Sequence, residues 1–400
     1  MGDILFLAHR VPFPPDRGDK IRAFHILKHL AERAPVHLVA FADDLRDLTI
    51  QGYDTMTASR ALVWRGKSRL RAAAEAITTR RPVSVAAFAD GEIARAVTRV
   101  LETRDIDTIY VFSSQMAQYL PADTRARIVM DFCDVDSAKF ADYARSASGP
   151  RAWMLGREAR MLRAHDFEVA RRADASLFVS RAEAQLFRDL GGEGRIATVE
   201  NGIDTRYFDP AAAFAPVASE SPLIVFTGQM DYQPNVEGVT WFADAILPRI
   251  QLRHADAAFA IVGRSPTAEV RALESRAGIT VTGQVADVRG WLAAASVVVA
   301  PLRIARGVQN KVLEAMAMAR PVVVSDVAGQ GIDHGATLVT AADAQGFADA
   351  VSALLDDPQA AAQRGAAARA QVQQRYGWEA CLAPLDSMVG FPAAVGRNAA

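Results

Sequence analysis

The chain has 400 residues, of which 50% are apolar and 23% are charged, and its formal net charge is −1. This length and composition predict a well-packed globular protein of two domains. The near-neutral charge argues against a general nucleic-acid binder. The two cysteines, Cys133 and Cys381, have neither the spacing of a zinc site nor that of a disulfide framework.

The amino-terminal half reads as a strand from Ile4 to His9, a loop with three prolines, and a helix from Ile21 to Arg33. Four more segments rich in Val, Ile and Phe follow, separated by helix-like stretches: VHLVAF, IDTIYVF, RIVMDF and ASLFVS. Such alternation predicts a parallel sheet with helices on both faces. The first strand begins almost at Met1, without the parts of a secretory signal. No apolar run is long enough to span a bilayer, so we expect a cytoplasmic protein.

The first loop carries a candidate binding segment, Gly18, Asp19, Lys20 and Arg22. A glycine permits close approach of the backbone to a ligand. Basic residues in a first helical turn oppose the helix dipole unless an anion lies nearby. We therefore expect this segment to meet a donor phosphate or an acceptor, and the alternative is a surface turn stiffened by its prolines.

A basic segment runs from Arg60 to Arg81, with seven Lys or Arg against one acidic residue and with Trp64, Leu70 and Ile77 interleaved. This pattern suits an anionic membrane surface, on the inner face of the plasma membrane for a cytoplasmic protein. The alternative is a solvated basic helix.

The segment 209–222 is rich in Pro, Ala and Ser and predicts a linker. It divides the chain into a first domain, 1–208, a second domain, 223–374, and a last segment, 375–400, whose helix is expected to cross back to the first domain. The second half repeats the strand pattern with LIVFTG, AAFAIVG, ITVTG, SVVVAP, PVVVSD and TLVTA. Strands that end in glycine make tight turns at the carboxyl edge of a sheet, where open α/β sheets bind ligands.

The stretch RGVQNKVLEAMAMARPVVVSD, from Arg306 to Asp326, predicts a glycine loop, a helix over about 309–319 and a strand. Its first turn presents free backbone N–H groups and carries Lys311, an arrangement that suits a diphosphate. Glu314 lies one turn further on the same face, where its carboxylate can accept hydrogen bonds from ribose hydroxyls. The alternative is a surface Lys/Glu pair on a core helix.

Several segments together carry a family resemblance: VENGIDTRYFDP, FTGQMDYQPNVEG, AIVG, VTGQVADVRGWLAAASVVVAP and GVQNKVLEAMAMARPVVVSD. In this order the chain resembles glycosyltransferase family 4, the retaining GT-B enzymes, over nearly its whole length. With RVPFPPDRGDKIR and DFCDVDS added, it looks most like the sugar transferases of bacterial exopolysaccharide and PEP-CTERM/exosortase loci. The resemblance implies an α/β protein of GT-B fold, with two Rossmann-like domains whose parallel sheets face each other across a cleft.

The resemblance also implies the site residues. Arg306 stands where the family has the first of two glutamates, and Gln229 and Asn235 stand at or near the places of a phosphate-binding arginine and lysine. Asp131, Asp134 or Asp136 lies in the neighbourhood of a histidine that contacts the reacting sugar in many relatives. The residues expected to bind the donor are Gly228, Gln229, Asn235, Gly263, Gly283, Val285, Gly307, Val308, Lys311 and Glu314. The residues expected to act in catalysis are Lys311, Glu314, Arg306 and Asp134.

The implied reaction moves a sugar from a nucleoside diphosphate sugar to a glycan or lipid-linked acceptor. Lys311 and the helix N–H groups would stabilise the departing diphosphate, so neither a metal nor a further cofactor is expected. The DVD at Asp134–Asp136 matches a metal-binding pattern by letter, but that pattern belongs to a different fold. Two rivals stay open, a nucleotide-sugar 2-epimerase of the same fold and a non-catalytic partner subunit. The donor sugar and the acceptor are not determined.

Overall fold

A computed structural model describes residues 2–15, 18–49, 55–305 and 308–391. Contacts divide the chain into two compact units, one of residues up to Asn201 together with those from Cys381 on, the other Gly202–Ala380. In the described parts of the chain no helix is long and apolar enough to cross a membrane.

The first unit contains a sheet of seven parallel strands in the order β3-β2-β1-β4-β5-β6-β7. These strands are β1 (Asp3–Ala8), β2 (Val36–Ala42), β3 (Ser59–Trp64), β4 (Ile106–Phe112), β5 (Arg127–Cys133), β6 (Ala175–Phe178) and β7 (Ile196–Thr198). Central β1 is buried on both faces, which is why its sequence is a continuous apolar run. Its register places Ile4 beside Val36 on one side and Thr108 on the other. Edge strand β3 occupies the start of the basic segment, where the sequence alone indicated no strand.

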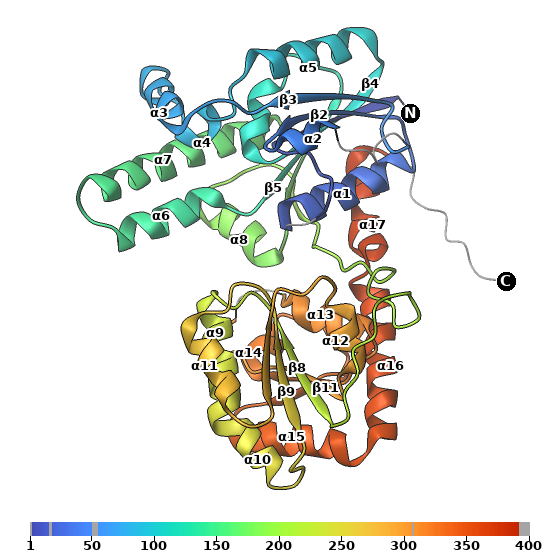
Figure 1. The fold of residues 1–400 in the computed structure, drawn as a ribbon. Coiled ribbons are helices and arrows are strands. Elements are labelled where there is room, and N and C mark those ends of the chain that lie inside the picture. Colours follow the sequence, from blue (N-terminus) through green and yellow to red (C-terminus); the bar gives the residue numbers. More distant parts are fainter. Residues whose placement is uncertain (1, 16–17, 50–54, 306–307, 392–400) are drawn as a thin grey trace, which may run out of the picture. The chain divides into compact units, whose positions relative to one another are not determined.

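Helices cover this sheet, and α6 and α7 lie side by side (Figure 1). The helices of the first unit are α1 (Gly18–Ala31), α2 (Leu45–Thr49), α3 (Arg69–Thr78), α4 (Val83–Ala86), α5 (Gly91–Thr103), the 3₁₀ helix η1 (Ser114–Tyr119), α6 (Asp136–Ser146), α7 (Gly149–Arg172) and α8 (Arg181–Asp189). The last helix, α17 (Trp378–Val389), spans the second division point. Its later residues pack on the first unit, where Asp386 contacts His29 at 2.7 Å and Thr108 donates a hydrogen bond to the Val389 carbonyl.

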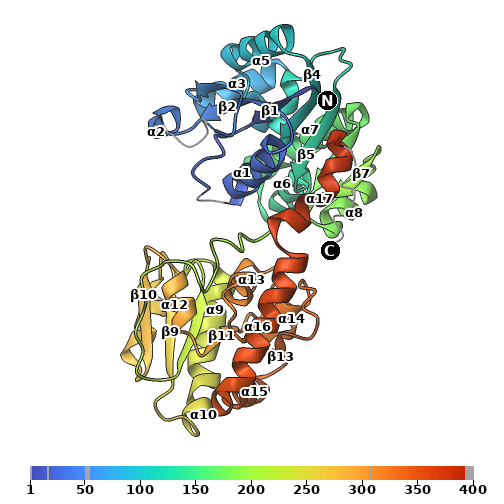
Figure 2. The same ribbon diagram turned by 90° about the vertical axis from the view of Figure 1, so that its right-hand side faces the viewer.

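The second unit contains six parallel strands in the order β10-β9-β8-β11-β12-β13. They are β8 (Leu223–Thr227), β9 (Ala258–Val262), β10 (Ile279–Gly283), β11 (Val297–Ala300), β12 (Val322–Ser325) and β13 (Val339–Ala341). Its helices are α9 (Gln233–Trp241), the π-helical turn η2 (Phe242–Ile246), α10 (Leu247–Gln251), α11 (Ala268–Ala272), the 3₁₀ turn η3 (Leu273–Ser275), α12 (Arg289–Ala294), α13 (Asn310–Ala317), α14 (Asp326–Gly329), α15 (Ala344–Asp356) and α16 (Pro358–Arg375). Figure 2 shows α16 running along this unit beside α13 and α15.

The segment expected to be a linker is packed on the second unit. Phe214 of this segment lies against the core of the second unit, as does Phe208 just before it, and further upstream Ile203 donates a backbone hydrogen bond to the Tyr376 carbonyl at 2.7 Å. A Cβ at Gly290 would stand 2.3 Å from the Ala215 carbonyl oxygen, so this backbone runs directly over α12. The division therefore falls at Asn201 rather than in 209–222, because apolar side chains anchor the segment.

The order of strands creates one special position in each sheet. In the first sheet the winding reverses between β1 and β4, and in the second between β8 and β11. Loops at the carboxyl ends of such neighbouring strands diverge and leave a crevice, which is where doubly wound sheets bind their ligands.

Candidate functional site

A pocket of about 520 Å³ lies at the carboxyl edge of the second sheet. Its wall combines the ends of β8 and β9, the loop after β10 and the first turns of α9 and α13. The lining residues are Thr227, Gly228, Gln229, Tyr232, Asn235, Val262, Gly263, Arg264, Gln284, Val285, Val288, Val308, Gln309, Asn310, Lys311 and Glu314. Eight of the ten predicted donor-binding residues are among them. Of the other two, Gly283 directly precedes Gln284, and Gly307 lies outside the described residues, as does Arg306.

Two glycines allow the strand ends to approach the pocket. A Cβ at Gly228 would lie 2.8 Å from Asn235 Nδ2 and 3.2 Å from Lys311 Nζ. A Cβ at Gly263, whose φ is +155°, would lie 1.6 Å from the Gly228 carbonyl oxygen. Any side chain at these positions would therefore displace the neighbouring backbone or the polar side chains of the pocket.

Lys311 is held in the first turn of α13 at the wall of the pocket. Its ammonium contacts Asn235 Oδ1 at 2.5 Å and lies 4.3 Å from the centre of the Phe226 ring. Burial lowers the pKa of Lys311 to about 8, although the nearby Glu314 carboxylate opposes this shift. The amide and the ring shield the side chain of Lys311, which is half-buried in the wall of the pocket.

Glu314 lies one helical turn deeper than Lys311 and is part of the same wall. Burial raises the pKa of its carboxyl group to about 7, against the attraction of the Lys311 ammonium. Burial thus disfavours the charged carboxylate, and hydrogen bonds from a bound polyol would stabilise it.

Gln229 and Asn235 form a small network with a residue that sequence reasoning missed. Arg264 Nη2 donates to Gln229 Oε1 at 3.0 Å, and Asn235 Nδ2 donates to the Gln229 carbonyl at 2.9 Å. Arg264 directly follows Gly263, just as Gln229 directly follows Gly228, and this parallel was a signal available in the sequence. Thr227 Oγ1 is also at the wall and has no hydrogen-bond partner in the described part of the chain.

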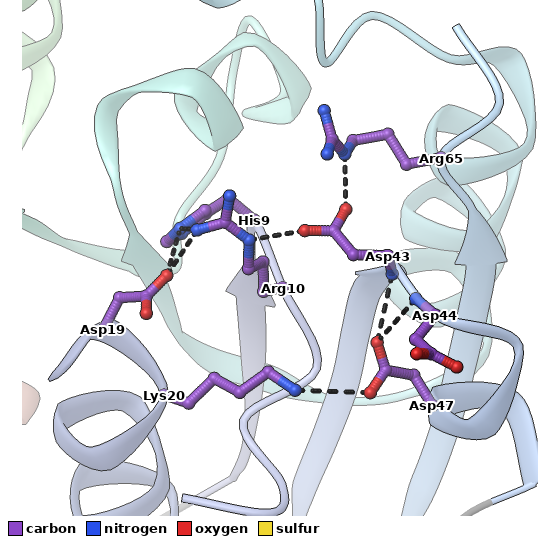
Figure 3. A network of polar contacts seen from close by, with 8 residues as sticks. All are labelled: His9, Arg10, Asp19, Lys20, Asp43, Asp44, Asp47 and Arg65. Atoms are coloured by element: carbon purple, nitrogen blue, oxygen red, sulfur yellow. Dashed lines mark hydrogen bonds and ion pairs between the residues drawn. The ribbon is translucent and has the colours of Figure 1, made fainter. Parts of the chain in front are cut away.

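Two of the predicted residues of the first loop, Asp19 and Lys20, lie in a polar network at the carboxyl ends of β1, β2 and β3 (Figure 3). Asp19 accepts from Arg10 at 2.5 Å and contacts His9 at 3.3 Å. Although burial acts in the opposite direction, these hydrogen bonds hold the pKa of Asp19 well below its ordinary value. Asp43 contacts both Arg10 and Arg65, each at 2.5 Å.

Lys20 and Arg22 differ from the expectation that they offer charge to a ligand. Lys20 is buried, and its ammonium lies 3.3 Å from Asp47 Oδ1 (Figure 3). Arg22 is 2% exposed and donates to Asp131 and to the Val199 carbonyl at 3.0 and 2.8 Å. Their positions in the first turn of α1 are thus balanced by carboxylates of this chain. Gly18 is exposed, and a Cβ there would meet no atom within 4 Å.

Asp134, predicted to act in catalysis, is paired at the surface of the first unit. Lys139 Nζ lies 2.8 Å from Asp134 and 3.1 Å from Asp136, so one ammonium serves both carboxylates of the DVD sequence. Despite partial burial, hydrogen bonding to these two groups raises the pKa of Lys139. Asp131 is fully buried between Arg22 and the Tyr110 hydroxyl, which donates to it at 2.8 Å.

Comparison with known proteins gives the following relatives. Residues 221–357 match the family model described as glycosyl transferases group 1. A glycogen synthase of Mycobacterium tuberculosis is 27% identical over 250 residues, which are 59% of this chain and 59% of that protein. An alpha-maltose-1-phosphate synthase of the same organism is 31% identical over 215 residues, 46% of this chain and 53% of that protein. The chain thus matches less than two thirds of the length of these curated relatives.

Solved structures resemble the chain over nearly its whole length. HepE of Anabaena in complex with UDP has a TM-score of 0.64 at 16% identity, covering 97% of this chain and 99% of that one. Sucrose-phosphate synthase from Thermosynechococcus elongatus has a TM-score of 0.63 at 17% identity, covering 97% and 98%. The predicted α/β architecture with two Rossmann-like parallel-sheet domains is confirmed. Residues 221–357 of this chain are therefore similar to the glycosyl transferases group 1, and the chain as a whole has a GT-B fold.

Proposed function

We propose that the chain is a retaining glycosyltransferase that uses a nucleoside diphosphate sugar as donor. The observation that carries the proposal is the pocket in which Lys311 and Glu314 meet the glycine turns at the carboxyl edge of the second sheet. HepE, which shares the fold, was solved with UDP and with UDP-glucose, and this supports a uridine nucleotide as the first donor to test.

In this proposal the diphosphate lies against the N–H groups of the first turn of α13, beside Lys311. Gln229, which stands where the family has a phosphate-binding arginine, carries no charge. Arg264, whose guanidinium donates to Gln229, supplies the second positive group there. Glu314 accepts hydrogen bonds from the ribose hydroxyls. A bound anion favours the charged lysine, and ribose hydrogen bonds favour the charged glutamate, so the ligand opposes the effect of burial on both groups.

The chemistry follows from this arrangement. The bond between the anomeric carbon and the diphosphate oxygen breaks, and a bond from the same carbon to the acceptor oxygen forms on the same face. The acceptor proton passes to the departing diphosphate. Lys311 stabilises the negative charge that develops on this leaving group. One such positive group lowers the activation free energy by about 3 to 4 kcal/mol. The proposed step uses the charges of the chain itself and includes neither a metal ion nor a further cofactor.

We further propose a lipid-linked or glycan acceptor in bacterial exopolysaccharide synthesis, with docking on an anionic membrane through α3. Leu70 and Ile77 are 85% and 67% exposed on this helix, and Arg71 is also exposed. The charge available is smaller than the sequence indicated, because Arg65 pairs with Asp43 and Lys67 pairs with Glu75.

The test is a thermal-shift panel of nucleoside diphosphate sugars, followed by transfer assays with glycan and polyprenyl-phosphate-linked acceptors. A cognate donor at 100 times its Kd should stabilise the protein by about 2.7 kcal/mol. Donor consumption that requires an acceptor supports the transferase. An epimer formed without acceptor would favour the 2-epimerase, and donor binding without turnover would favour the non-catalytic subunit. The Lys311→Met variant is the control for binding at the proposed pocket, and no stabilisation by any donor would contradict the proposal.

A further inference from the structure

A second pocket, of about 500 Å³, lies within the first unit. It is bounded by the connection between α3 and α4, by the end of η1 and by the second half of α7. Its lining residues are Arg80, Arg81, Pro82, Ala117, Gln118, Leu120, Arg160, Met161, Ala164, His165, Glu168, Val169 and Arg172. None of the residues proposed to bind the donor belongs to it, so its chemistry is independent of the site described above.

The charge of this pocket is strongly positive. Four arginines line it, Arg80, Arg81, Arg160 and Arg172, against Glu168 as the carboxylate of the wall. In the described parts of the chain, no carboxylate forms an ion pair with any of the four. Arg80, Arg160 and Arg172 are exposed and Arg81 is half-buried, and Arg172 donates to the Pro121 carbonyl at 2.6 Å. Four guanidinium groups left without acidic partners around one cavity are the arrangement expected of an anion site.

The backbone helps to place two of these arginines. Arg80 has a φ of +55° at the end of α3, a position where glycine is the usual residue. The N–H of Arg81 donates to the Ala76 carbonyl at 3.1 Å, and Arg157 donates to the same carbonyl from α7 at 2.9 Å. An arginine in left-handed backbone costs about 1 kcal/mol relative to glycine, so this conformation of Arg80 lowers the stability of the fold by about that amount.

A histidine and two apolar side chains complete the wall of this pocket. His165 contacts the Ser114 carbonyl at 3.2 Å, and burial together with the Arg81 charge lowers the pKa of its ring, although the hydrogen bond acts in the opposite direction. Leu120 and Val169 are buried and form an apolar floor. A ligand with a charged head and a carbon skeleton would satisfy both surfaces.

We propose that this arginine pocket binds the phosphate or diphosphate group of an organic ester. Guanidinium groups bind phosphoryl oxygens through two parallel hydrogen bonds, and the proposal is of binding alone, without a covalent step. The ester is either a soluble sugar or nucleoside phosphate or the headgroup of a phospholipid, because both present the same phosphoryl chemistry. The exposed apolar side chain of Ile77 lies near the end of α3, three residues before Arg80.

The test measures pyrophosphate binding by calorimetry on the full chain, in a Lys311→Met background that disables the donor pocket. The pocket variant carries Arg80→Gln, Arg81→Gln and Arg160→Gln, and the matched control removes three exposed arginines of and after α5, with Arg95→Gln, Arg99→Gln and Arg104→Gln. We expect the pocket variant to bind at least about tenfold more weakly and the control to bind as the parent does. Circular dichroism checks folding, and the single variant Arg160→Gln, at an exposed position, gives a second reading with less perturbation.

The source of the phosphoryl group is separated by two further arms. A lipid headgroup is identified if the parent protein binds phosphatidylglycerol vesicles, the pocket variant does not, and pyrophosphate displaces the parent from them. A soluble ester is identified if the protein binds glycerol phosphate with an affinity similar to that for pyrophosphate, while the pocket variant and the control variant bind vesicles equally well. Pyrophosphate affinity that is equal in the pocket and control variants, or no pyrophosphate binding in the Lys311→Met background, would overturn the proposal.

Discussion

The affinity of the donor pocket for a nucleoside diphosphate should fall steeply between pH 7 and pH 9. Lys311 has a pKa lowered to about 8 by burial, so its charged fraction falls from about 90% at pH 7 to about 10% at pH 9. The terminal phosphate of the ligand is already ionised above pH 7 and adds little to the slope. Binding that requires the ammonium should therefore weaken about tenfold, which corresponds to about 1.4 kcal/mol.

The assay is isothermal titration of UDP at pH 7, 8 and 9 in two buffers of different ionisation enthalpy. At pH 8 the wild type should take up about half a proton per UDP bound, because the diphosphate favours the charged lysine. Lys311→Met has a similar length and no titrating group at this position, so it should bind weakly and show neither the proton uptake nor the decline toward pH 9. Glu314 stays in both proteins, and its ionisation on binding releases a proton rather than taking one up. A flat profile in the wild type, or the same slope in Lys311→Met, would refute the role assigned to this lysine.

Three further outcomes are expected. Glu314→Gln should raise the Tm of the ligand-free protein relative to wild type, and the difference should grow from about pH 5 to pH 7. The reason is that the raised pKa of Glu314 makes the wild type lose stability as this carboxyl group ionises. Equal Tm profiles would contradict a carboxylate that burial destabilises. Gly228→Ala should weaken UDP binding about tenfold or more with a change in Tm of only a few degrees, because its Cβ would crowd Lys311 Nζ at 3.2 Å; unchanged affinity would misplace the diphosphate. Leu70→Gln with Ile77→Gln should reduce binding to phosphatidylglycerol vesicles at low salt while changing stability within about 0.5 kcal/mol, since both side chains are exposed; identical vesicle binding would remove the membrane role of α3.

Much of the fold was determined locally by the sequence. A strand buried on both faces is apolar at most positions, so runs such as Val297–Ala300 and Val322–Ser325 indicated a parallel sheet. The spacing of Lys311 and Glu314 placed both on one face of a helix whatever surrounds them. Glycine at the ends of β8 and β9 marked the pocket, because a close approach of backbone excludes any Cβ.

The tertiary structure decided which charges meet. Nothing near Arg22 in the sequence indicates Asp131, which lies 109 residues away and neutralises it in the core. Arg264 reaches Gln229 only because β8 and β9 are neighbours in the sheet, and the four arginines of the second pocket come in pairs from two distant segments, the connection between α3 and α4 and helix α7. Periodicity and turn chemistry act over a few residues and are legible in the sequence, whereas the pairing of charges depends on contacts between distant segments, which only the folded chain brings together.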